Sequence, residues 1–449
     1  MKGHRYLPLT EQDRREMLEA IGVTSIDDLF ADIPEEVRFK GSLNLPPALS
    51  ELELVRHMKE LAGANATVND YACFMGAGAY DHFIPTVVDA VLSRGEFYSA
   101  YTPYQPEVSQ GTLQTIYEYQ TLICELTSMD IAQASMYDGA TALAEAALMA
   151  CAVTRRRRII MAESIHPEYL EVIRTYTQGR DLELVTVGTQ GGRVDLEALE
   201  RTVDKQTACV LLQTPNFFGL LEDGPKVGEV AHHAGALFVV CTDPISLGVL
   251  KPPGEYGADI VVGEGQPLGN PLSFGGPYLG FFAAREKFMR RMPGRMIAMT
   301  EDNRGQRGFV MALQTREQHI RREKATSNIC TNEALCALAA CVYLCAMGRQ
   351  GFRQVAELCL QKAHYAAERI SGLEGFELAF EGPFFKEFTV KCPVPADQVV
   401  KELLSHRILA GVPLGRFFPE MRNHLLVCVT EKRTKEEIDH LVRRLEGLA

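Results

Sequence analysis

Residues 208–263 read ACVLLQTPNFFGLLEDGPKVGEVAHHAGALFVVCTDPISLGVLKPPGEYGADIVVG. This segment contains three short apolar runs, ACVLLQTP, ALFVVCTDP and ADIVVG, and the stretch KVGEVAHHAG between the first two is typical of a helix. Two similar runs come earlier, RRIIMAE (157–163) and LELVTVG (182–188), so apolar runs recur at intervals of roughly 20 to 30 residues. Apolar strands separated by helices indicate a mostly parallel sheet covered on both faces, and hence an α/β fold. Ligands of such sheets bind at the carboxyl ends of the strands.

The length of the chain favours more than one domain. We predict an N-terminal helical arm over 1–70, a large α/β domain over 71–330, and a smaller C-terminal α+β domain over 331–449. The apolar stretch ALCALAACVYLCAM (334–347) predicts a buried helix at the start of the last domain. The pattern TKEEIDHLVRRLEGL (434–448) predicts an amphipathic helix at its end.

The arm carries two helix-start signals. Thr10 is placed to cap the helix TEQDRREMLEAIG, and Ser50 with Glu53 has the spacing of a capping box at the start of SELELVRHMKELAG. Prolines separate these helices, so the arm cannot bury much surface on itself. We expect it to wrap a neighbour, within the chain or across a subunit contact.

Charge and cysteine usage argue against several classes of function. The chain has 46 basic and 58 acidic side chains, a net charge of −12, which disfavours nonspecific binding to nucleic acid or anionic membranes. The N-terminus lacks the apolar segment of a signal peptide, and the apolar run 334–347 is too short to span a bilayer. The 12 cysteines lack metal-ligand spacing and are expected to be free thiols in a reducing cytosol. We therefore expect a cytoplasmic protein without a metal site.

One predicted helix has small residues at its start. In YDGATALAEAALMA, Gly139, Ala140 and Thr141 lie at the helix N-terminus, where small side chains let backbone N–H groups face an anion such as a phosphate. A tight strand-to-helix turn capped by Asp138 explains the same residues equally well. Both interpretations stay open.

An acidic residue stands at the end of a predicted strand, because ALFVVCTDP closes with Asp243 and a proline. An aspartate at a strand end, followed by a strand and a loop with a lysine, is the layout of a pyridoxal-phosphate site. The aspartate pairs with the pyridine nitrogen, and the lysine forms a Schiff base with the aldehyde. Here the loop has no lysine between Lys251 and Lys287, and Gln266 lies within it. Taken by itself, Asp243 is more often a turn or capping residue than a cofactor ligand.

Four long strings carry a family resemblance: FMGAGAYDHFIPTVV (74–88), YTPYQPEVSQGTLQTIYEYQT (101–121), TPNFFGLLED (214–223) and HIRREKATSNICTNEAL (319–335). Together they resemble the glycine decarboxylase family, the P-protein of the glycine cleavage system. The resemblance implies a fold-type-I pyridoxal-phosphate architecture. At 449 residues the chain is similar to the N-terminal half of this family, the α subunit, which pairs with a β subunit in an α2β2 assembly.

The resemblance also implies an activity and a place for the cofactor. The reaction is decarboxylation of glycine, with transfer of the aminomethyl group to the lipoyl arm of the H-protein. In this family the C-terminal half bears the lysine, and Gln266 stands at the matching loop of the N-terminal half. A glutamine amide is not nucleophilic, so pyridoxal phosphate is expected on the β subunit and not covalently on this chain. Lys324 is flanked by charges typical of a solvated or ion-paired loop.

The first candidate contribution to the partner's active site is the segment YTPYQPEVSQG. Pro103 and Pro106 keep it out of a helix, so that Tyr101, Tyr104 and Gln105 are presented on a stiff loop. Tyrosines supply both an apolar wall and a hydroxyl. We predict that the two tyrosines line the mouth of the partner's site, while interface packing remains the alternative.

The second candidate contribution is Thr326, Ser327 and Asn328, which follow a basic run and precede a long helix. Hydroxyl and amide donors near a helix entrance suit a phosphate, so we predict that these residues lie near the partner's cofactor phosphate. Plain helix capping by Ser327 or Thr331 is the alternative.

Two other functions remain open from the sequence. The chain could be an independent pyridoxal-phosphate enzyme that uses a lysine elsewhere, or a noncatalytic structural partner whose loops never reach the cofactor. A covalent cofactor adduct on the isolated chain would indicate the first, and the dense polar and aromatic content of YTPYQPEVSQG argues against the second.

Overall fold

The computed structural model describes most of the chain, namely residues 6–99, 101–325, 327, 329 and 331–448. It separates into two compact units, residues 1–65 and residues 66–449. The predicted large and small domains both fall in the second unit, so the boundary expected at residue 330 stays a proposal.

The first unit has two α-helices and a 3-10 turn, which are α1 (Glu11–Ile21), η1 (Asp27–Phe30) and α2 (Glu51–Gly63). At the start of α1 the Thr10 hydroxyl accepts the N–H of Asp13, and the Asp13 carboxylate accepts the N–H of Thr10. Ser50 and Glu53 make the same reciprocal bonds at the start of α2. Both predicted caps are confirmed. No residue of either helix is buried, as expected for a unit too small to form a core.

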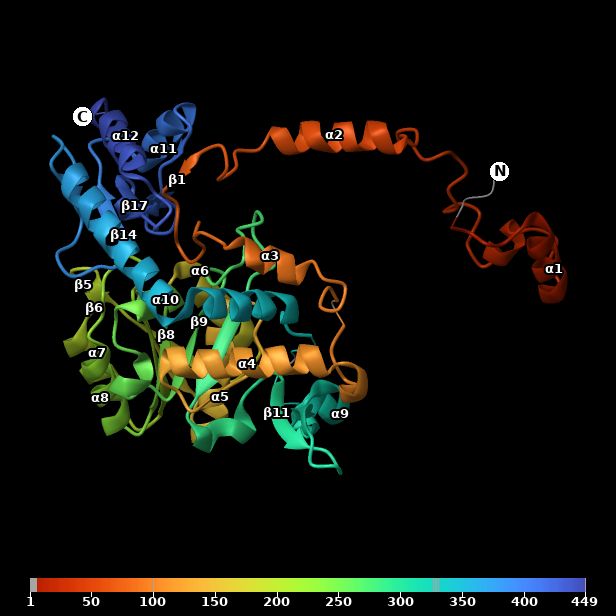
Figure 1. Cartoon of the computed structure of the whole chain (residues 1–449), viewed down its shortest axis with the longest axis horizontal. Coiled ribbons are helices and arrows are strands. Elements are labelled where there is room, and N and C mark those ends of the chain that lie inside the picture. Colours follow the sequence, from red (N-terminus) through yellow and green to blue (C-terminus); the bar gives the residue numbers. More distant parts are fainter. Residues whose placement is uncertain (1–5, 100, 326, 328, 330, 449) are drawn as a thin grey trace. The chain divides into compact units, whose positions relative to one another are not determined.

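The second unit is built around a seven-stranded sheet (Figure 1). In order across the sheet the strands are β2 (Ile131–Ala132), β10 (Gly280–Ala284), β9 (Ile260–Glu264), β8 (Leu237–Cys241), β7 (Thr207–Gln213), β3 (Arg158–Ala162) and β4 (Glu183–Val187). All neighbours from β9 to β4 pair in parallel, and β10 is antiparallel to both β9 and β2. Strands β8 and β9 are buried along their whole length, because helices cover both faces. The mostly parallel sheet predicted from the apolar runs is confirmed.

Four helices connect or cover the parallel strands: α5 (Gly139–Thr154), α6 (Pro167–Thr177), α7 (Leu196–Thr202) and α8 (Gly224–His233). The connection from β3 through α6 to β4 runs in one direction across the sheet. The connections from β4 through α7 to β7, and from β7 through α8 to β8, run in the opposite direction. Because parallel crossovers are right-handed, the two groups lie on opposite faces. Accordingly α6 packs against α5, and α7 packs against α8.

Two long helices, α4 (Gln110–Thr127) and α10 (Ala334–Ser371), pack against each other (Figure 1). Helix α10 is longer than the predicted apolar helix, because the chain turns helical again after a break at Gly348, where φ is 59° and ψ is 177°. By length and composition α10 could cross a membrane, and 44% of its most apolar window is buried. A buried core helix passes the same test, so this feature is weak evidence for a membrane span.

The C-terminal part forms a smaller α+β layer with its own apolar core. Its elements are β13 (Glu377–Leu378), β14 (Glu387–Lys391), α11 (Ala396–Ser405), β16 (Val412–Pro413), β17 (His424–Cys428) and α12 (Lys435–Glu446). The predicted closing helix is confirmed as α12. A short parallel pair of strands, β1 (Ala72–Cys73) and β15 (Ile408–Leu409), ties the start of this unit to the C-terminal layer.

The remaining short helices and strands are α3 (Thr86–Leu92), β5 (Thr189–Gln190), β6 (Arg193–Val194), β11 (Met296–Glu301), β12 (Arg307–Ala312) and α9 (Gln318–Arg321). The 3-10 turns are η2 (Pro106–Val108), η3 (Pro244–Gly248), η4 (Pro253–Tyr256), η5 (Glu286–Arg291), η6 (Gln314–Arg316), η7 (Arg322–Lys324), η8 (Leu414–Arg416) and η9 (Pro419–Met421). Strands β11 and β12 form a hairpin beside α4.

Candidate functional site

Gln266 lies two residues beyond β9 and is 1% exposed. Its side-chain oxygen accepts the N–H of Tyr80 at 2.9 Å, and its amide nitrogen donates to the carbonyls of Tyr80 (3.1 Å) and Asn270 (2.7 Å). Every strong hydrogen-bonding group of this amide therefore binds backbone. Gln266 fixes the segment around Tyr80 and has no nucleophilic atom for a cofactor.

Asp243 follows β8 and has two partners. Its carboxylate accepts the N–H of Ile245 at 3.1 Å, which caps the turn η3, and it forms an ion pair with the Nζ of Lys386 at 2.8 Å. The two side chains of this pair are 9% and 2% exposed, respectively. Asp243 is thus a turn cap, as one interpretation of the sequence held, and its negative charge is matched by a lysine of the chain itself.

Lys386 is enclosed on all sides. Its Nζ lies 3.5 Å from the centre of the Tyr80 ring and 2.9 Å from the Nε2 of His82. Burial by itself would lower the pKa of Lys386, but the Asp243 carboxylate and two neighbouring thiols together act in the opposite direction, and the pKa lies above its usual value. A lysine that stays protonated is not a nucleophile. Lys386 therefore does not fit the role of an overlooked Schiff-base lysine.

Glu264 is the last residue of β9, and its carboxylate faces the start of α5. Its Oε2 accepts the N–H of Gly139 at 2.9 Å, and its Oε1 accepts the N–H groups of Gln266 (2.9 Å) and Leu279 (3.0 Å). Burial raises the pKa of Glu264 to about 7, against the three N–H donors that lower it. The N-terminus of α5 therefore binds a carboxylate of the same chain, that of Glu264.

The start of α5 also has the predicted cap. The Asp138 carboxylate accepts the N–H of Thr141 at 2.7 Å, and the Thr141 hydroxyl accepts the N–H of Asp138. Ala140 is buried next to them. The predicted cap by Asp138 is confirmed, and the N–H of Gly139, which the other interpretation assigned to an anion such as a phosphate, binds the Glu264 carboxylate.

Glu387 joins the C-terminal layer to this site. Its carboxylate accepts the N–H of Ala77 and the hydroxyl of Tyr80, both at 2.7 Å. Burial raises the pKa of Glu387, although these donors and Lys386 act in the opposite direction. The backbone of Glu387 also lies against Gly219, where φ is +94° and a Cβ would sit 2.1 Å from the Glu387 carbonyl oxygen. The motif TPNFFG therefore needs its glycine for contact between the two layers.

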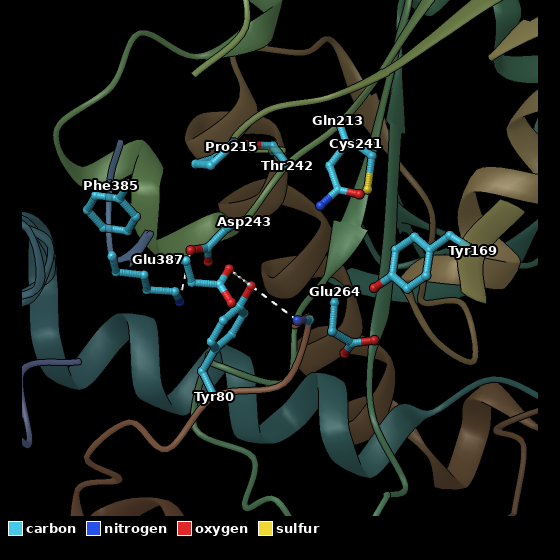
Figure 2. A pocket seen from close by; sticks show the side chains of 12 residues that line it. Tyr80, Tyr169, Gln213, Pro215, Cys241, Thr242, Asp243, Glu264, Phe385 and Glu387 are labelled. Carbon is cyan, nitrogen blue, oxygen red and sulfur yellow. Dashed lines mark hydrogen bonds and ion pairs between the residues drawn. The ribbon is translucent and has the colours of Figure 1, made fainter. Parts of the chain in front are cut away.

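The pyridoxal phosphate that the resemblance implies does not fit these residues. Figure 2 shows Asp243, Glu387 and Tyr80 on one side of the pocket, with Glu264 and Tyr169 on the other. In the loop where the resemblance implies a lysine stands Gln266, bound to backbone; the Asp243 carboxylate already holds Lys386, and the N–H of Gly139 at the start of α5 already binds Glu264. No catalytic step follows from this pocket.

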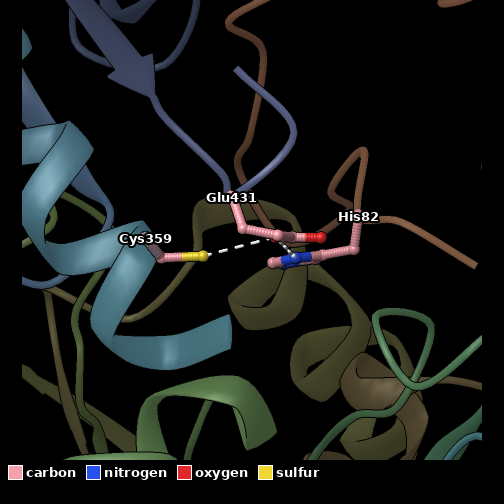
Figure 3. A group of neighbouring side chains, drawn as sticks. All are labelled: His82, Cys359 and Glu431. Carbon is pink, nitrogen blue, oxygen red and sulfur yellow. Dashed lines mark hydrogen bonds and ion pairs between the residues drawn. The ribbon is translucent and has the colours of Figure 1, made fainter. Parts of the chain in front are cut away.

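A neighbouring cluster contains three residue types that often bind metals (Figure 3). The Lys386 ammonium can only donate, so the Nε2 of His82 accepts, and the Nδ1–H of His82 donates to Glu431 at 2.5 Å. The Cys359 thiol lies 3.4 Å from the same carboxylate. Burial raises the pKa of Cys359 well above its usual value. Burial acts against the charged form of Glu431, but His82 and nearby N–H groups hold its pKa at about 2. His82 and Cys359 each form a hydrogen bond with Glu431, and we assign no metal to the three residues.

The predicted loop is presented as the prolines indicate. Tyr101 is 73% exposed and Tyr104 is 37% exposed, their rings meet edge to face, and Gln105 is also exposed. The Tyr104 hydroxyl accepts a hydrogen bond from Nη2 of Arg295 at 2.8 Å, and its ring meets that of His319 edge to face. Tyr104 is therefore held in place, while its neighbours face outward.

Arg295 is the buried support of this loop. It is 2% exposed, its Nε lies 3.8 Å from the Glu317 carboxylate, and its Nε and Nη1 have no hydrogen-bond partner among the residues that the structure describes. Glu317 also lines a small pocket together with Ser327. The structure thus links the tyrosine loop to the segment of Ser327 through Arg295 and Glu317.

The second predicted set is only partly visible, because Thr326 and Asn328 lie outside the described residues. The Ser327 hydroxyl accepts the N–H of Ile329 at 3.4 Å and does not cap a helix. Helix α10 starts after Glu333, whose N–H donates to Ser135 at 3.0 Å. Capping of α10 by Ser327 or Thr331 is therefore wrong. The proximity of this segment to a partner's phosphate stays a prediction.

Two residues of the pocket, Glu264 and Lys386, were missed from the sequence. A signal existed for Glu264, because an acid that closes the run IVVG is expected at a strand end. The signal for Lys386 was weaker: the lysine in GPFFKEFTV reads as the outward residue of a half-exposed strand. Lys324, the lysine that the motifs drew attention to, is exposed.

The sequence comparisons agree with one another. The family model described as "Glycine cleavage system P-protein" matches residues 4–445. A protein of Desulfitobacterium hafniense named probable glycine dehydrogenase (decarboxylating) subunit 1 is 58% identical over 437 residues, which cover 97% of this chain and 98% of the relative. A protein of the same name from Carboxydothermus hydrogenoformans is 57% identical and covers 99% of each chain.

The structural comparisons extend this result. A crystal structure of glycine decarboxylase (P-protein) of the glycine cleavage system, in inhibitor-bound form, matches with a TM-score of 0.90 and 43% identity, covering 99% of this chain and 100% of the other. A NifS-like protein (TM-score 0.61, 14% identity, 84% of this chain and 98% of the other) shares the fold alone. A sphingosine-1-phosphate lyase of Burkholderia pseudomallei (TM-score 0.66, 15% identity, 91% of this chain and 93% of the other) also shares the fold alone. The architecture is that of fold-type-I pyridoxal-phosphate enzymes, and the chain belongs to the glycine cleavage system P-protein family.

Proposed function

We propose that this chain is the α subunit of a two-subunit glycine decarboxylase. Together with a lysine-bearing β subunit it decarboxylates glycine and passes the aminomethyl group to the lipoyl arm of an H-protein. The proposal rests on family membership over residues 4–445 and on relatives named subunit 1 that match along nearly their whole length. We place the complex, an α2β2 assembly, in the cytoplasm.

The assignment of the cofactor to the β subunit rests on Gln266. Its amide stands where the reacting lysine is needed and is fully bonded to backbone at 1% exposure. The pyridoxal phosphate therefore belongs to the β subunit, and the isolated α chain has no reacting site. In this arrangement the α chain acts through the loops it presents to its partner.

The part of this chain that we assign to the partner's site is the loop of Tyr101, Tyr104 and Gln105. Glycine has no side chain to fill a pocket, so the site needs walls that exclude water and larger amino acids. Tyr104 suits this role because Arg295 donates to its hydroxyl oxygen and leaves the O–H proton free to donate. We also assign Thr326, Ser327 and Asn328 to the partner's cofactor phosphate, because hydroxyl and amide donors near a helix entrance suit a phosphate.

The experiment is coexpression of this chain with its β subunit, followed by the glycine–CO2 exchange assay with lipoylated H-protein. We expect activity only from the complex. The isolated chain, and the isolated chain carrying Gln266→Lys, should both be inactive, because Lys386 and Glu264 still fill the pocket. An active isolated chain would refute the proposal.

A further inference from the structure

The pocket beside Gln266 has an anion seat at one end. Three backbone N–H groups from separate segments, those of Gly139, Gln266 and Leu279, converge on the Glu264 carboxylate at 2.9–3.0 Å. One of them is the first residue of α5, a 16-residue helix whose N-terminus carries partial positive charge. A Cβ at Gly139 would lie 2.7 Å from the Tyr169 hydroxyl and 2.9 Å from the Glu264 nitrogen, so the anion and the helix start are in direct contact.

The other end of the pocket is a cation seat. The Lys386 ammonium lies 2.8 Å from the Asp243 carboxylate and 3.5 Å from the centre of the Tyr80 ring. It also donates a hydrogen bond to the Nε2 of His82. A carboxylate, an aromatic face and a ring nitrogen acceptor form a complete shell for one buried cation.

The two seats belong to a single site. Strands β8 and β9 are parallel neighbours, so their carboxyl ends meet at the same edge of the sheet. Asp243 follows the first strand and Glu264 ends the second, and both line the same pocket together with Lys386. The pocket is thus complementary to a ligand that carries a negative charge at one end and a positive charge at the other.

We infer that this pocket is a cofactor site closed by the chain's own charges, with the Glu264 carboxylate in the place of the cofactor's phosphate and the Lys386 ammonium in the place of its pyridinium. The cofactor is thereby excluded by occupation, in addition to the loss of the reacting lysine. This inference concerns the folded chain alone and does not depend on the activity proposed above.

A second consequence concerns the two layers of the unit. Lys386 directly precedes β14 and Glu387 begins it, whereas Asp243, Tyr80 and Ala77 come from elsewhere in the chain. With the cation built into β14, the C-terminal layer is bound to the sheet edge permanently. No ligand is needed to close the site.

The test is thermal unfolding of the isolated full chain at about pH 8, where Glu264 is ionised. The probes are inorganic phosphate and pyridoxine 5'-phosphate, which lacks the aldehyde and cannot react with surface lysines, with chloride at equal ionic strength as reference. The wild type should not respond to either probe. A dose-dependent rise in its unfolding temperature with either one would overturn the inference.

The variant Glu264→Ala opens the anion seat and leaves its three N–H donors unpaired. Phosphate should then raise the unfolding temperature by roughly 3 °C or more in a saturable manner. Glu264→Gln keeps the seat filled and should not respond. Glu222→Ala removes another half-buried glutamate, which accepts the backbone N–H of Val194 away from α5, and it should lose stability without a phosphate response. Absence of phosphate rescue in Glu264→Ala would overturn the inference.

If Glu264→Ala does not fold, the cation seat provides the decisive measurement. Lys386→Ala leaves Asp243 facing a space that a short alkylammonium ion fills. Ethylammonium chloride should raise the unfolding temperature of this variant and not that of the wild type, with sodium chloride as reference. Equal responses of the two proteins would overturn the inference.

Discussion

The Nζ of Lys386 lies 2.8 Å from the carboxylate of Asp243, and both side chains are nearly inaccessible to solvent. One residue precedes β14 of the C-terminal layer, and the other follows β8 of the large sheet. This ion pair joins the two layers at the sheet edge where fold-type-I enzymes bind their cofactor. On the proposal made above, it holds this edge of the sheet together without a cofactor.

The first prediction concerns the strength of this pair. Lys386→Met should lower the free energy of unfolding by about 3 kcal/mol or more, because it leaves Asp243 buried and unpaired. The double variant Lys386→Met, Asp243→Asn should regain part of that loss, since the uncompensated charge is gone. Urea unfolding of the isolated chain measures both.

The matched control is Lys391→Met, at the far end of β14. Lys391 pairs with Glu377, and these side chains are 53% and 62% exposed. Its removal should change the free energy of unfolding by less than about 1 kcal/mol. Similar losses for Lys386→Met and Lys391→Met would show that the buried pair has no special role.

The second prediction concerns pH. Because burial raises the pKa of Glu264 to about 7, from about 4.5 when unfolded, the folded state favours the protonated acid. The contribution of Glu264 to stability is then highest below about pH 4.5 and falls by about 3 kcal/mol as the pH rises through 7. Glu264→Gln should remove this fall, measured as the difference in unfolding free energy from wild type across this range.

Glu431 offers a control of opposite sign. Its pKa is held at about 2 in the folded state, so its stabilising effect is present above its unfolded pKa and is lost as the pH falls toward 2. Glu431→Gln should therefore alter the acid side of the stability profile and not the slope between about pH 5 and 8. An unchanged slope in Glu264→Gln would contradict the assigned pKa.

The third prediction concerns the tyrosine loop. In the assembled complex Tyr104→Phe should lower turnover by roughly tenfold or more, about 1.4 kcal/mol of barrier, while assembly stays intact. Arg295→Met should act in the same direction, since it removes the donor that holds the Tyr104 hydroxyl. Tyr98→Phe, at an exposed tyrosine outside the motif, should have no effect. Parallel loss of assembly and activity would mark the loop as interface packing.

The fourth prediction concerns the phosphate of the partner's cofactor. Thr326→Ala, Ser327→Ala and Asn328→Ala should each weaken retention of pyridoxal phosphate by the complex, by roughly tenfold for a hydrogen bond to a charged group. Ser327→Ala should leave the unfolding temperature of the isolated chain unchanged, because its hydroxyl does not cap α10. Ser405→Ala, at an exposed hydroxyl of α11, is the control. Unchanged retention in all three variants would disprove the assignment.

Much of the fold followed from local patterns. Runs such as ACVLLQTP and ADIVVG became buried parallel strands because continuous apolar sequence fits a strand covered on both faces. The caps at Thr10, Ser50 and Asp138 depend on residues three positions apart, which sequence shows directly. Helix α10 was predicted too short because its second half, beyond Gly348, is amphipathic and does not continue the uninterrupted apolar run.

The contents of the pocket could not be predicted in the same way. Asp243 and Gln266 stand out because each lies just beyond an apolar strand. Lys386 reaches Asp243 only through the packing of β14 against the sheet edge, a contact between segments far apart in the chain. Periodicity shows which face of a strand is buried but not which strand ends meet. The sequence therefore showed that the loop of Gln266 has no lysine, and the structure showed which side chains of the chain fill the pocket.

The most direct test of this account is the mass of each subunit in the purified complex after borohydride reduction, which fixes any Schiff base covalently. We predict that the β subunit gains the mass of one reduced cofactor and that this chain keeps its unmodified mass. A reduced-cofactor adduct on this chain, at Lys386 or any other lysine, would contradict the account.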